Sequence, residues 1–335
     1  MTLARLPVLR TAAIAVAAAT VLATLTGPPV LAKSPHDTAG PASSAVTRTD
    51  PRRTRGLFVD PKMPAARAGS EFARIGKLAQ ALWITDYYPT TSVRSAVRDY
   101  TSRAILAGKT PMMAVYAIPG RDCGLSSAGG FVTYPDYRAW IRQVAKGVKG
   151  QKAIVVLEPD AVAFMGDPRC TDAGPRQQVL AYAARLLRDA GAWVYLDAGH
   201  SGWRSAPEMA RLLKLSGIRY ARGFSTNVGN YRRTVDELAY AKALARKLGA
   251  RGLPGKHYVI ETARNGAGGD PVDGDVCNPT WARIGKAPSL VFEGRLDGYL
   301  WVKHPGESDG DASECHGGPP SGAWWPAGAR VLLGR

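Results

Sequence analysis

The chain has 335 residues, of which 45% are hydrophobic and 8% aromatic, and its formal net charge is +17. Part of this charge lies near the N-terminus, and much of the rest falls on the polar faces of predicted helices, for example at Arg94, Arg98, Arg138 and Arg142. That distribution favours a solvated surface over a nucleic-acid groove, so we expect no nucleic-acid partner.

The N-terminus reads as a secretory signal peptide over residues 1–32. Arg5 and Arg10 precede an apolar run from residue 12 to residue 25, and Val30-Leu31-Ala32 offers a small-residue cleavage site. A membrane anchor is the alternative, but the uncharged stretch is short for a span and no other segment is long enough. We expect a secreted, extracellular protein that keeps no integral membrane contact after cleavage.

Residues 33–70 are rich in Pro, Ala, Ser, Thr and Arg without periodicity, which predicts a disordered tether. Residues 71–335 are enough for one α/β catalytic domain, which we expect to be a monomer. Four cysteines contain no CxxC pair, and export together with their even number favours two disulfides over zinc. HExxH is also absent, so we expect no metal site. The cysteines are Cys123, Cys170, Cys277 and Cys315.

Seven apolar runs read as strands, near residues 80–84, 112–116, 153–157, 192–196, 220–224, 257–261 and 298–302. Apolar residues at helical spacing lie between most of them, and Thr234 followed by Glu237 reads as a capping box. Strands alternating with helices predict a mostly parallel sheet, best closed into a TIM-like β/α barrel. An open doubly wound sheet is the alternative, but neither GxGxxG nor GxxxxGK[ST] occurs.

Polar side chains follow every predicted strand. In Val155–Asp160 the strand must stop at Glu158-Pro159-Asp160, because proline cannot donate to a sheet ladder. Carboxyl ends of parallel strands share one face, so these groups would form a catalytic floor. The strands are followed in turn by Asp86, Asp122, Asp160, Asp197 with His200, Asn227 with Asn230, Glu261 with Arg264, and Asp309.

Converging carboxylates suit either a hard divalent metal ion or glycoside hydrolysis. Aromatic residues near the strand ends favour the second, because aromatic faces pack against the apolar faces of sugar rings. These aromatic residues are Trp83, Tyr87, Tyr88, Tyr116, Trp203, Tyr231 and Trp301.

Five motifs resemble glycoside hydrolase family 6, the inverting cellulases that include endoglucanases and cellobiohydrolases. They are Tyr116–Cys123, Leu157–Asp160, Tyr195–His200, Thr226–Tyr231 and Trp301–Gly310. The resemblance runs from about Trp83 to Trp325 in the family's order. It implies a distorted barrel with fewer than eight strands, disulfides Cys123–Cys170 and Cys277–Cys315, a β-1,4-glucan substrate and no cofactor.

The same resemblance implies roles for individual residues. Asp160 would be the general acid, Asp122 the like charge that keeps it protonated, and Asp309 the proposed base. Ser127 would lie on the loop that holds the attacking water, and Tyr116 would press the sugar ring out of its chair. The implied substrate-binding residues are Trp83, Asp197, His200, Trp203, Asn227, Asn230, Trp301, Lys303 and Glu307.

Three of these assignments have alternatives. Asp122 could instead form a salt bridge with Arg121, Asp197 could order its neighbours rather than bind sugar, and His200 could be a buried, hydrogen-bonded residue. The chain also departs from the family pattern. Val276 stands where the family places a tryptophan, and Glu261 stands where aspartate is more familiar, which would alter the cleft wall.

The stretch from Asp309 to Ser321 is short and rich in glycine and proline, and no long insertion interrupts the motifs. This predicts an open cleft and endo action on internal β-1,4-glucosidic bonds. Cellobiohydrolase-type exo action, a non-catalytic carbohydrate-binding protein and a metal-dependent phosphoesterase are the alternatives.

Overall fold

The structure is a computed structural model that describes residues 50–335 apart from 126, 171–173, 269–273 and 312–314. The predicted signal peptide and residues 33–49 of the predicted tether lie outside these residues. No helix in the described part of the chain is long and apolar enough to cross a membrane.

The described residues form one sheet of eight strands in the order β1-β2-β3-β4-β5-β6-β8-β7. Neighbours from β1 to β8 run parallel, as the sequence predicted, whereas β7 and β8 are antiparallel. β7 escaped prediction because it is a partly exposed edge strand that lacks a buried apolar run. The strands are β1 (Leu82–Thr85), β2 (Met112–Tyr116), β3 (Ile154–Leu157), β4 (Trp193–Asp197), β5 (Gly223–Thr226), β6 (His257–Glu261), β7 (Ser289–Glu293) and β8 (Leu296–Leu300).

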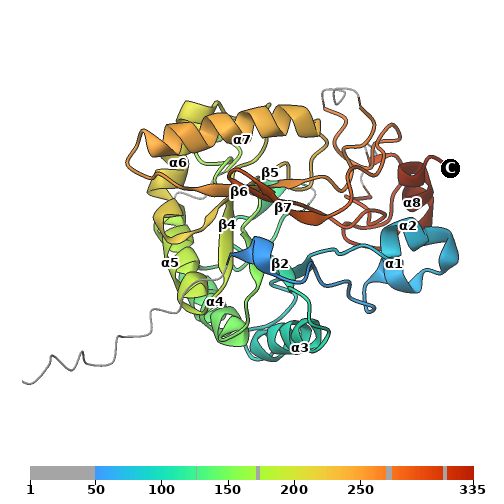
Figure 1. Cartoon of the computed structure of the whole chain (residues 1–335), viewed down its shortest axis with the longest axis horizontal. Coiled ribbons are helices and arrows are strands. Elements are labelled where there is room, and N and C mark those ends of the chain that lie inside the picture. The colour runs from blue at the N-terminus through green and yellow to red at the C-terminus, as the bar shows by residue number, and fades with distance from the viewer. Residues whose placement is uncertain (1–49, 126, 171–173, 269–273, 312–314) are drawn as a thin grey trace, which may run out of the picture. The chain divides into compact units, whose positions relative to one another are not determined.

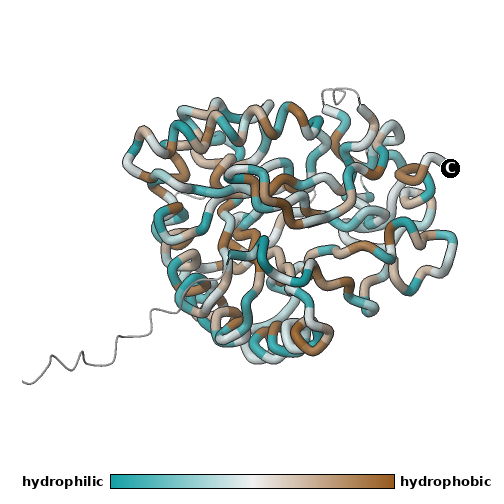
Figure 2. The backbone as a smooth tube through the Cα atoms, in the orientation of Figure 1, coloured by the Kyte–Doolittle hydropathy of each residue, from teal (hydrophilic) through white to brown (hydrophobic). Residues whose placement is uncertain are grey.

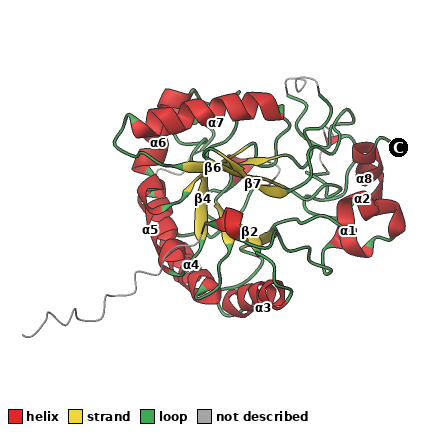
Figure 3. Cartoon of the chain, viewed as in Figure 1, coloured by secondary structure: helices red, strands yellow, loops and turns green. Residues whose placement is uncertain are grey.

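Five helices follow the first five strands and form an arc outside the sheet (Figure 1, Figure 3). They are α3 (Val93–Leu106), α4 (Tyr134–Val148), α5 (Arg176–Asp189), α6 (Ala206–Leu215) and α7 (Thr234–Gly249). The remaining side carries α1 (Pro64–Arg67), α2 (Ala73–Gly76) and α8 (Pro326–Leu333). Four short 3-10 helices complete the elements of the described residues: η1 (Pro51–Arg53), η2 (Ser70–Phe72), η3 (Asp122–Gly124) and η4 (Ile218–Tyr220).

Strand residues alternate between two apolar layers, and both layers are buried. Met113, Val115 and Leu157 point outward and pack against the helices. Met112 and Val156 point inward and fill the barrel with their neighbours from the other strands. The strands at the centre of the molecule are accordingly among the hydrophobic stretches of the chain in Figure 2.

The barrel closes between β1 and β8 without a strand ladder. The Ala81 amide donates to the Trp301 carbonyl at 3.0 Å, and the Trp83 indole donates to the Val302 carbonyl at 2.7 Å. These contacts, here called the seam, join the two ends of the parallel array. Because single hydrogen bonds rather than a regular strand ladder close the barrel here, its closure is irregular. This agrees with the distorted barrel that the resemblance implied.

The tether prediction is wrong for residues 50–70, because this segment is built into the domain. Asp50 caps η1 and forms an ion pair with Arg222 at 3.0 Å. Arg52 lies 3.3 Å from the fully buried carboxylate of Asp297 and donates to the Gly294 carbonyl. A composition rich in Pro and Arg predicted disorder, but these long-range ion pairs hold the segment in place.

The predicted capping box of α7 is also wrong. Arg233 is the N-cap residue, so Thr234 is already inside the helix, and its hydroxyl accepts a hydrogen bond from Asn265. Glu237 is buried and accepts from the Ser201 amide at 2.8 Å instead of turning back to the N-cap. Tertiary contacts therefore replace the local cap.

We predict that residues 50–53 stabilise the domain. A chain that begins at Gly56 lacks Asp50 and Arg52. Arg222 then loses its ion pair with Asp50, and the buried carboxylate of Asp297 loses the nearby guanidinium of Arg52. Its free energy of unfolding should be lower by about 2 kcal/mol, measured by urea denaturation with disulfides intact. A chain that begins at Arg48 is the control and should match the full chain. Equal stability of the two truncations would contradict the prediction.

Candidate active site

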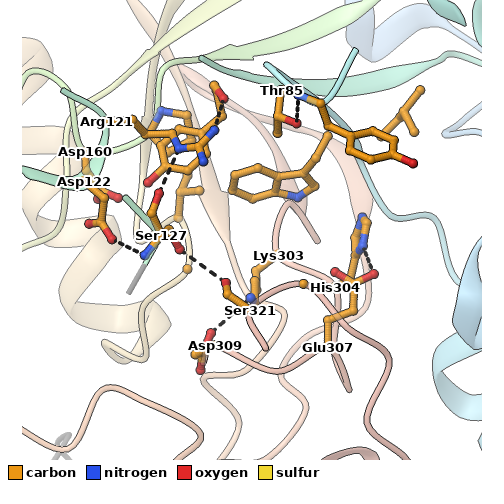
Figure 4. Close-up of a pocket in the computed structure, with 18 of the residues that line it drawn as sticks. Thr85, Arg121, Asp122, Ser127, Asp160, Lys303, His304, Glu307, Asp309 and Ser321 are labelled. Atoms are coloured by element: carbon orange, nitrogen blue, oxygen red, sulfur yellow. Dashed lines mark hydrogen bonds and ion pairs between the residues drawn. The ribbon is translucent and has the colours of Figure 1, made fainter. Parts of the chain in front are cut away.

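A cleft of about 1400 Å³ lies over the carboxyl ends of the strands. Figure 4 shows Asp122, Asp160 and Ser127 on one side of it and Lys303, His304 and Glu307 on another. Most residues that the sequence assigned to the site line this cleft. They are Trp83, Tyr116, Asp122, Ser127, Asp160, His200, Trp203, Asn230, Lys303, Glu307 and Asp309.

The two acids that follow β3, Glu158 and Asp160, have different roles. Glu158 is fully buried, and its carboxylate accepts from the Ala117 and Ile118 amides and from the Tyr137 hydroxyl, at about 3 Å each. It therefore fixes the chain that leaves β2. Asp160 faces the cleft with a left-handed backbone, φ 67°. Such a conformation is unfavourable for a non-glycine residue and persists because the surrounding contacts impose it.

The Asp160 carboxyl is held in its protonated form. Burial raises its pKa well above the ordinary value, and the negative charges of Asp197 and Asp122 raise it further. Within the described residues no lysine, arginine or histidine forms an ion pair with Asp160. The raised pKa favours the protonated form, which is the form that can donate a proton to a bound molecule.

Asp197 is fully buried and does not line the cleft, so its assignment to sugar binding is corrected. Its carboxylate accepts from the amides of Asp160 and Gly199 and from the Ser225 hydroxyl, at 2.9–3.0 Å. Burial raises the pKa of Asp197 to about 6, while these donors favour its ionised form. It orders the backbone of Asp160 and places a negative charge beneath it.

Asp122 does not form a salt bridge with Arg121. Arg121 pairs with Asp86 at 2.6 Å and also donates to the Ser127 and Tyr116 carbonyls. The Asp122 carboxylate instead accepts from the Ser127 amide at 2.7 Å, and burial raises its pKa. Asp122 and Arg121 together therefore fix the loop that carries Ser127 over the cleft.

Asp309 is the electrostatic opposite of Asp160. Its carboxylate lies 2.6 Å from Arg264 and 3.1 Å from Lys303. It also accepts from the Tyr231 hydroxyl and the Asn278 amide, both at 3.0 Å. The two cations and these hydrogen bonds hold the pKa of Asp309 far below its usual range despite its burial. The cleft thus contains one carboxyl group that keeps its proton and one that has lost it.

Aromatic side chains line the cleft on both sides of the acids. Trp83 packs edge-on against Tyr116, with ring centroids 5.2 Å apart. The ring centroids of Trp203 and His200 lie 5.5 Å apart, and His200 lines the cleft although it is partly buried and accepts from the Gly202 amide. Burial and nearby Arg232 lower the pKa of His200 to about 4, and its ring is neutral at physiological pH.

Two further assignments to sugar binding are wrong, because these side chains point into the protein. Trp301 is fully buried, and its indole donates to the Lys286 carbonyl. Asn227 is fully buried and donates to the Glu261 carbonyl. Glu261 is buried as well and accepts from the Lys303 amide, so it supports the cleft rather than forming its wall. Exposed Val276 does line the cleft.

Three residues shape the site without a specific role assigned from the sequence: Arg121, Arg264 and His304. Arg264 was named only as a polar group after a strand, and Arg121 only as a possible partner of Asp122. Each follows a strand within a recognised motif or beside a polar group, but its partner comes from a distant segment. A cation required for the enclosed carboxylate of Asp309 is the signal that could have pointed to Arg264. Within the described residues, no group of three or more His, Cys, Asp or Glu could hold a metal ion.

Residues 58–335 match the family model described as Glycosyl hydrolases family 6. The chain belongs to this family. It is 45% identical over 284 residues to Endoglucanase A of Cellulomonas fimi and 37% identical over 286 residues to Endoglucanase A of Thermobispora bispora. These matches cover 82% and 81% of this chain, but only 60% of either relative.

A solved structure agrees with this assignment. The endoglucanase Cel6 from Mycobacterium tuberculosis, in complex with methyl-cellobiosyl-4-deoxy-4-thio-β-D-cellobioside, superposes with a TM-score of 0.78 at 37% identity. The match covers 86% of this chain and 100% of that one. The family therefore accounts for the distorted barrel, and both expected disulfides, Cys123–Cys170 and Cys277–Cys315, are present.

We predict that Asp197→Asn lowers the pKa of Asp160, because it removes the negative charge beneath that carboxyl. If Asp160 must be protonated for activity, the alkaline limb of the kcat/KM profile should move to lower pH by about one unit. The exposed carboxylate of Asp189 on α5 provides the control variant Asp189→Asn, which should leave the profile unchanged. An unshifted alkaline limb in Asp197→Asn would show that the two groups are not coupled.

Proposed function

We propose that this protein is a secreted endo-β-1,4-glucanase that hydrolyses internal bonds of cellulose or a related β-glucan with inversion. The observation that carries the proposal is the opposed ionisation of Asp160 and Asp309 in one aromatic-lined cleft. An inverting glycosidase needs one acid to protonate the leaving oxygen while water attacks from the opposite face of the sugar. The relatives named endoglucanases support the proposal.

Asp160 is the proposed general acid, since it faces the cleft and keeps its proton near neutral pH. Asp122 supplies part of the negative field and holds Ser127, whose loop is positioned to order the attacking water. Tyr116, at the floor of the cleft beside Trp83, is placed to press a sugar ring out of its chair.

Asp309 is a weak candidate for the direct base. A carboxylate whose pKa lies far below neutral takes a proton poorly, and each oxygen of Asp309 already forms an ion pair with a cation. We infer that Asp309 instead stabilises positive charge that develops on the sugar ring, and that the proton of the attacking water leaves through other water molecules. Lys303, Glu307, His200, Trp203 and Asn230 are proposed to contact the sugars.

We infer endo action from the named relatives and from the cleft itself. The stretch after Asp309 is short, and Val276 leaves that part of the wall without the bulk of a tryptophan. If the enzyme cuts mid-chain, the viscosity of carboxymethylcellulose should fall early, while few reducing ends have formed. A slow fall in viscosity relative to reducing-end release would instead identify exo action.

The proposed general acid is tested by Asp160→Asn, with reducing-end release from carboxymethylcellulose measured in the presence of chelator. We predict a loss of about 10²- to 10⁴-fold in kcat/KM, because the amide cannot donate an acidic proton to the leaving oxygen. Asp189→Asn is again the control and should keep wild-type activity. Equal activity of wild type and Asp160→Asn would show that Asp160 is not the general acid. If neither protein were active, a non-catalytic carbohydrate-binding protein would be favoured.

A further inference from the structure

His304 lies at the seam and has no part in the chemistry proposed above. Its side chain is 9% exposed. The ring nitrogen Nδ1 lies 2.6 Å from Oε1 of Glu307, and Nε2 lies 2.5 Å from the carbonyl oxygen of Ala81. Both ring nitrogens therefore face oxygen atoms at hydrogen-bond distance.

With Glu307 ionised, this geometry favours a doubly protonated ring. A neutral imidazole has one N–H donor, whereas the imidazolium has two. The Ala81 carbonyl can only accept, and so can an ionised Glu307. A ring that donates to both must carry both protons. The Glu307 carboxylate raises the pKa of His304 above its ordinary value, although burial and nearby Lys303 oppose this.

Ala81 connects this ring to the closure of the barrel. Its amide already donates to the Trp301 carbonyl across the seam. Its carbonyl receives the return hydrogen bond from His304 rather than from a backbone amide. The His304 imidazolium thus donates the hydrogen bond that a backbone amide would donate if β1 and β8 formed a continuous ladder.

Glu307 lines the cleft on a tight turn. Gly306 has φ 90°, and a Cβ at that position would meet the Trp324 ring at 2.6 Å, so only glycine fits the turn. The Trp325 amide donates to the Gly306 carbonyl at 2.7 Å. The backbone is therefore fixed, and the direction of the Glu307 carboxylate depends on its contact with His304.

We propose that His304 is a positioning residue whose imidazolium holds the Glu307 carboxylate in the cleft as an acceptor for glucan hydroxyl groups and releases it on deprotonation. The proposal rests on the proposed glucan substrate. Among the described residues, the charged groups that act on the ring are Glu307 and Lys303, and the segment before β1 contributes the Ala81 carbonyl.

The expected effect falls on substrate binding. The contacts of His304 and Glu307 do not include Asp122 or Asp160. Because the pKa of His304 is raised, the ring stays doubly protonated below about pH 6.5. The ring loses one proton as the pH rises through the raised pKa. KM for cellotetraose should then increase, by roughly fivefold if one charged hydrogen bond weakens, while kcat changes little.

The protonation state can be measured without any glucan. A ¹⁵N-imidazole NMR titration, with the His304 signals assigned from His304→Gln, should show both ring nitrogens protonated at pH 6. Glu307→Gln should lower the pKa of His304. A ring that carries a single proton at pH 6 in the wild type would overturn the proposal. This titration succeeds or fails independently of the proposed enzymatic function.

The effect on binding is tested by steady-state kinetics between pH 5 and pH 9. His304→Gln keeps a donor near the Ala81 carbonyl but carries no charge. It should show the raised KM at every pH, with kcat near wild type. His316→Gln is the matched control, since His316 forms an exposed pair with Asp275 at 2.8 Å, and it should behave as wild type. A His304→Gln enzyme with the KM and pH dependence of wild type would overturn the proposal.

Discussion

The negative charge of Asp197 beneath Asp160 is the interaction on which the site depends. A buried carboxylate is costly unless donors satisfy it, and here two backbone amides and a hydroxyl do so. One of those amides belongs to Asp160 itself. The same contact therefore fixes the backbone of Asp160 and places beside its carboxyl the charge that keeps it protonated. The contact with Asp197 therefore fixes the position of Asp160 and adds to the effect of burial, which raises the pKa of Asp160 most.

The rest of the cleft follows from how the other acids are neutralised. Glu158 uses its carboxylate to hold the chain after β2, and Asp86 binds Arg121, so neither competes for the role of Asp160. Asp309 receives two cations and loses its proton. Acids of similar intrinsic pKa thus acquire different states through burial and partners alone. The parallel strands contribute by bringing all of them to one face.

The sequence predicted the fold well because buried parallel strands are nearly continuous apolar runs. It failed at β7, an edge strand, and at residues 50–70, where ion pairs with Arg222 and Asp297 override a composition typical of disorder. At the site it selected the right motifs but could not tell which side chain of each motif faces the cleft. Trp301 and Asn227 are neighbours of cleft residues and point inward. Direction depends on local backbone conformation, which motif spacing does not report.

His304 illustrates a site feature that only three-dimensional contacts disclose. Its two partners are three and 223 positions away in the chain, and one of them is a backbone carbonyl that no sequence pattern marks. A barrel with a continuous ladder would satisfy Ala81 with a backbone amide that has no titratable proton. Because the barrel closes here through a side chain, the protonation of that side chain links closure of the sheet to the direction of Glu307. The distortion of the fold therefore places a titratable side chain between the two ends of the parallel array and the cleft.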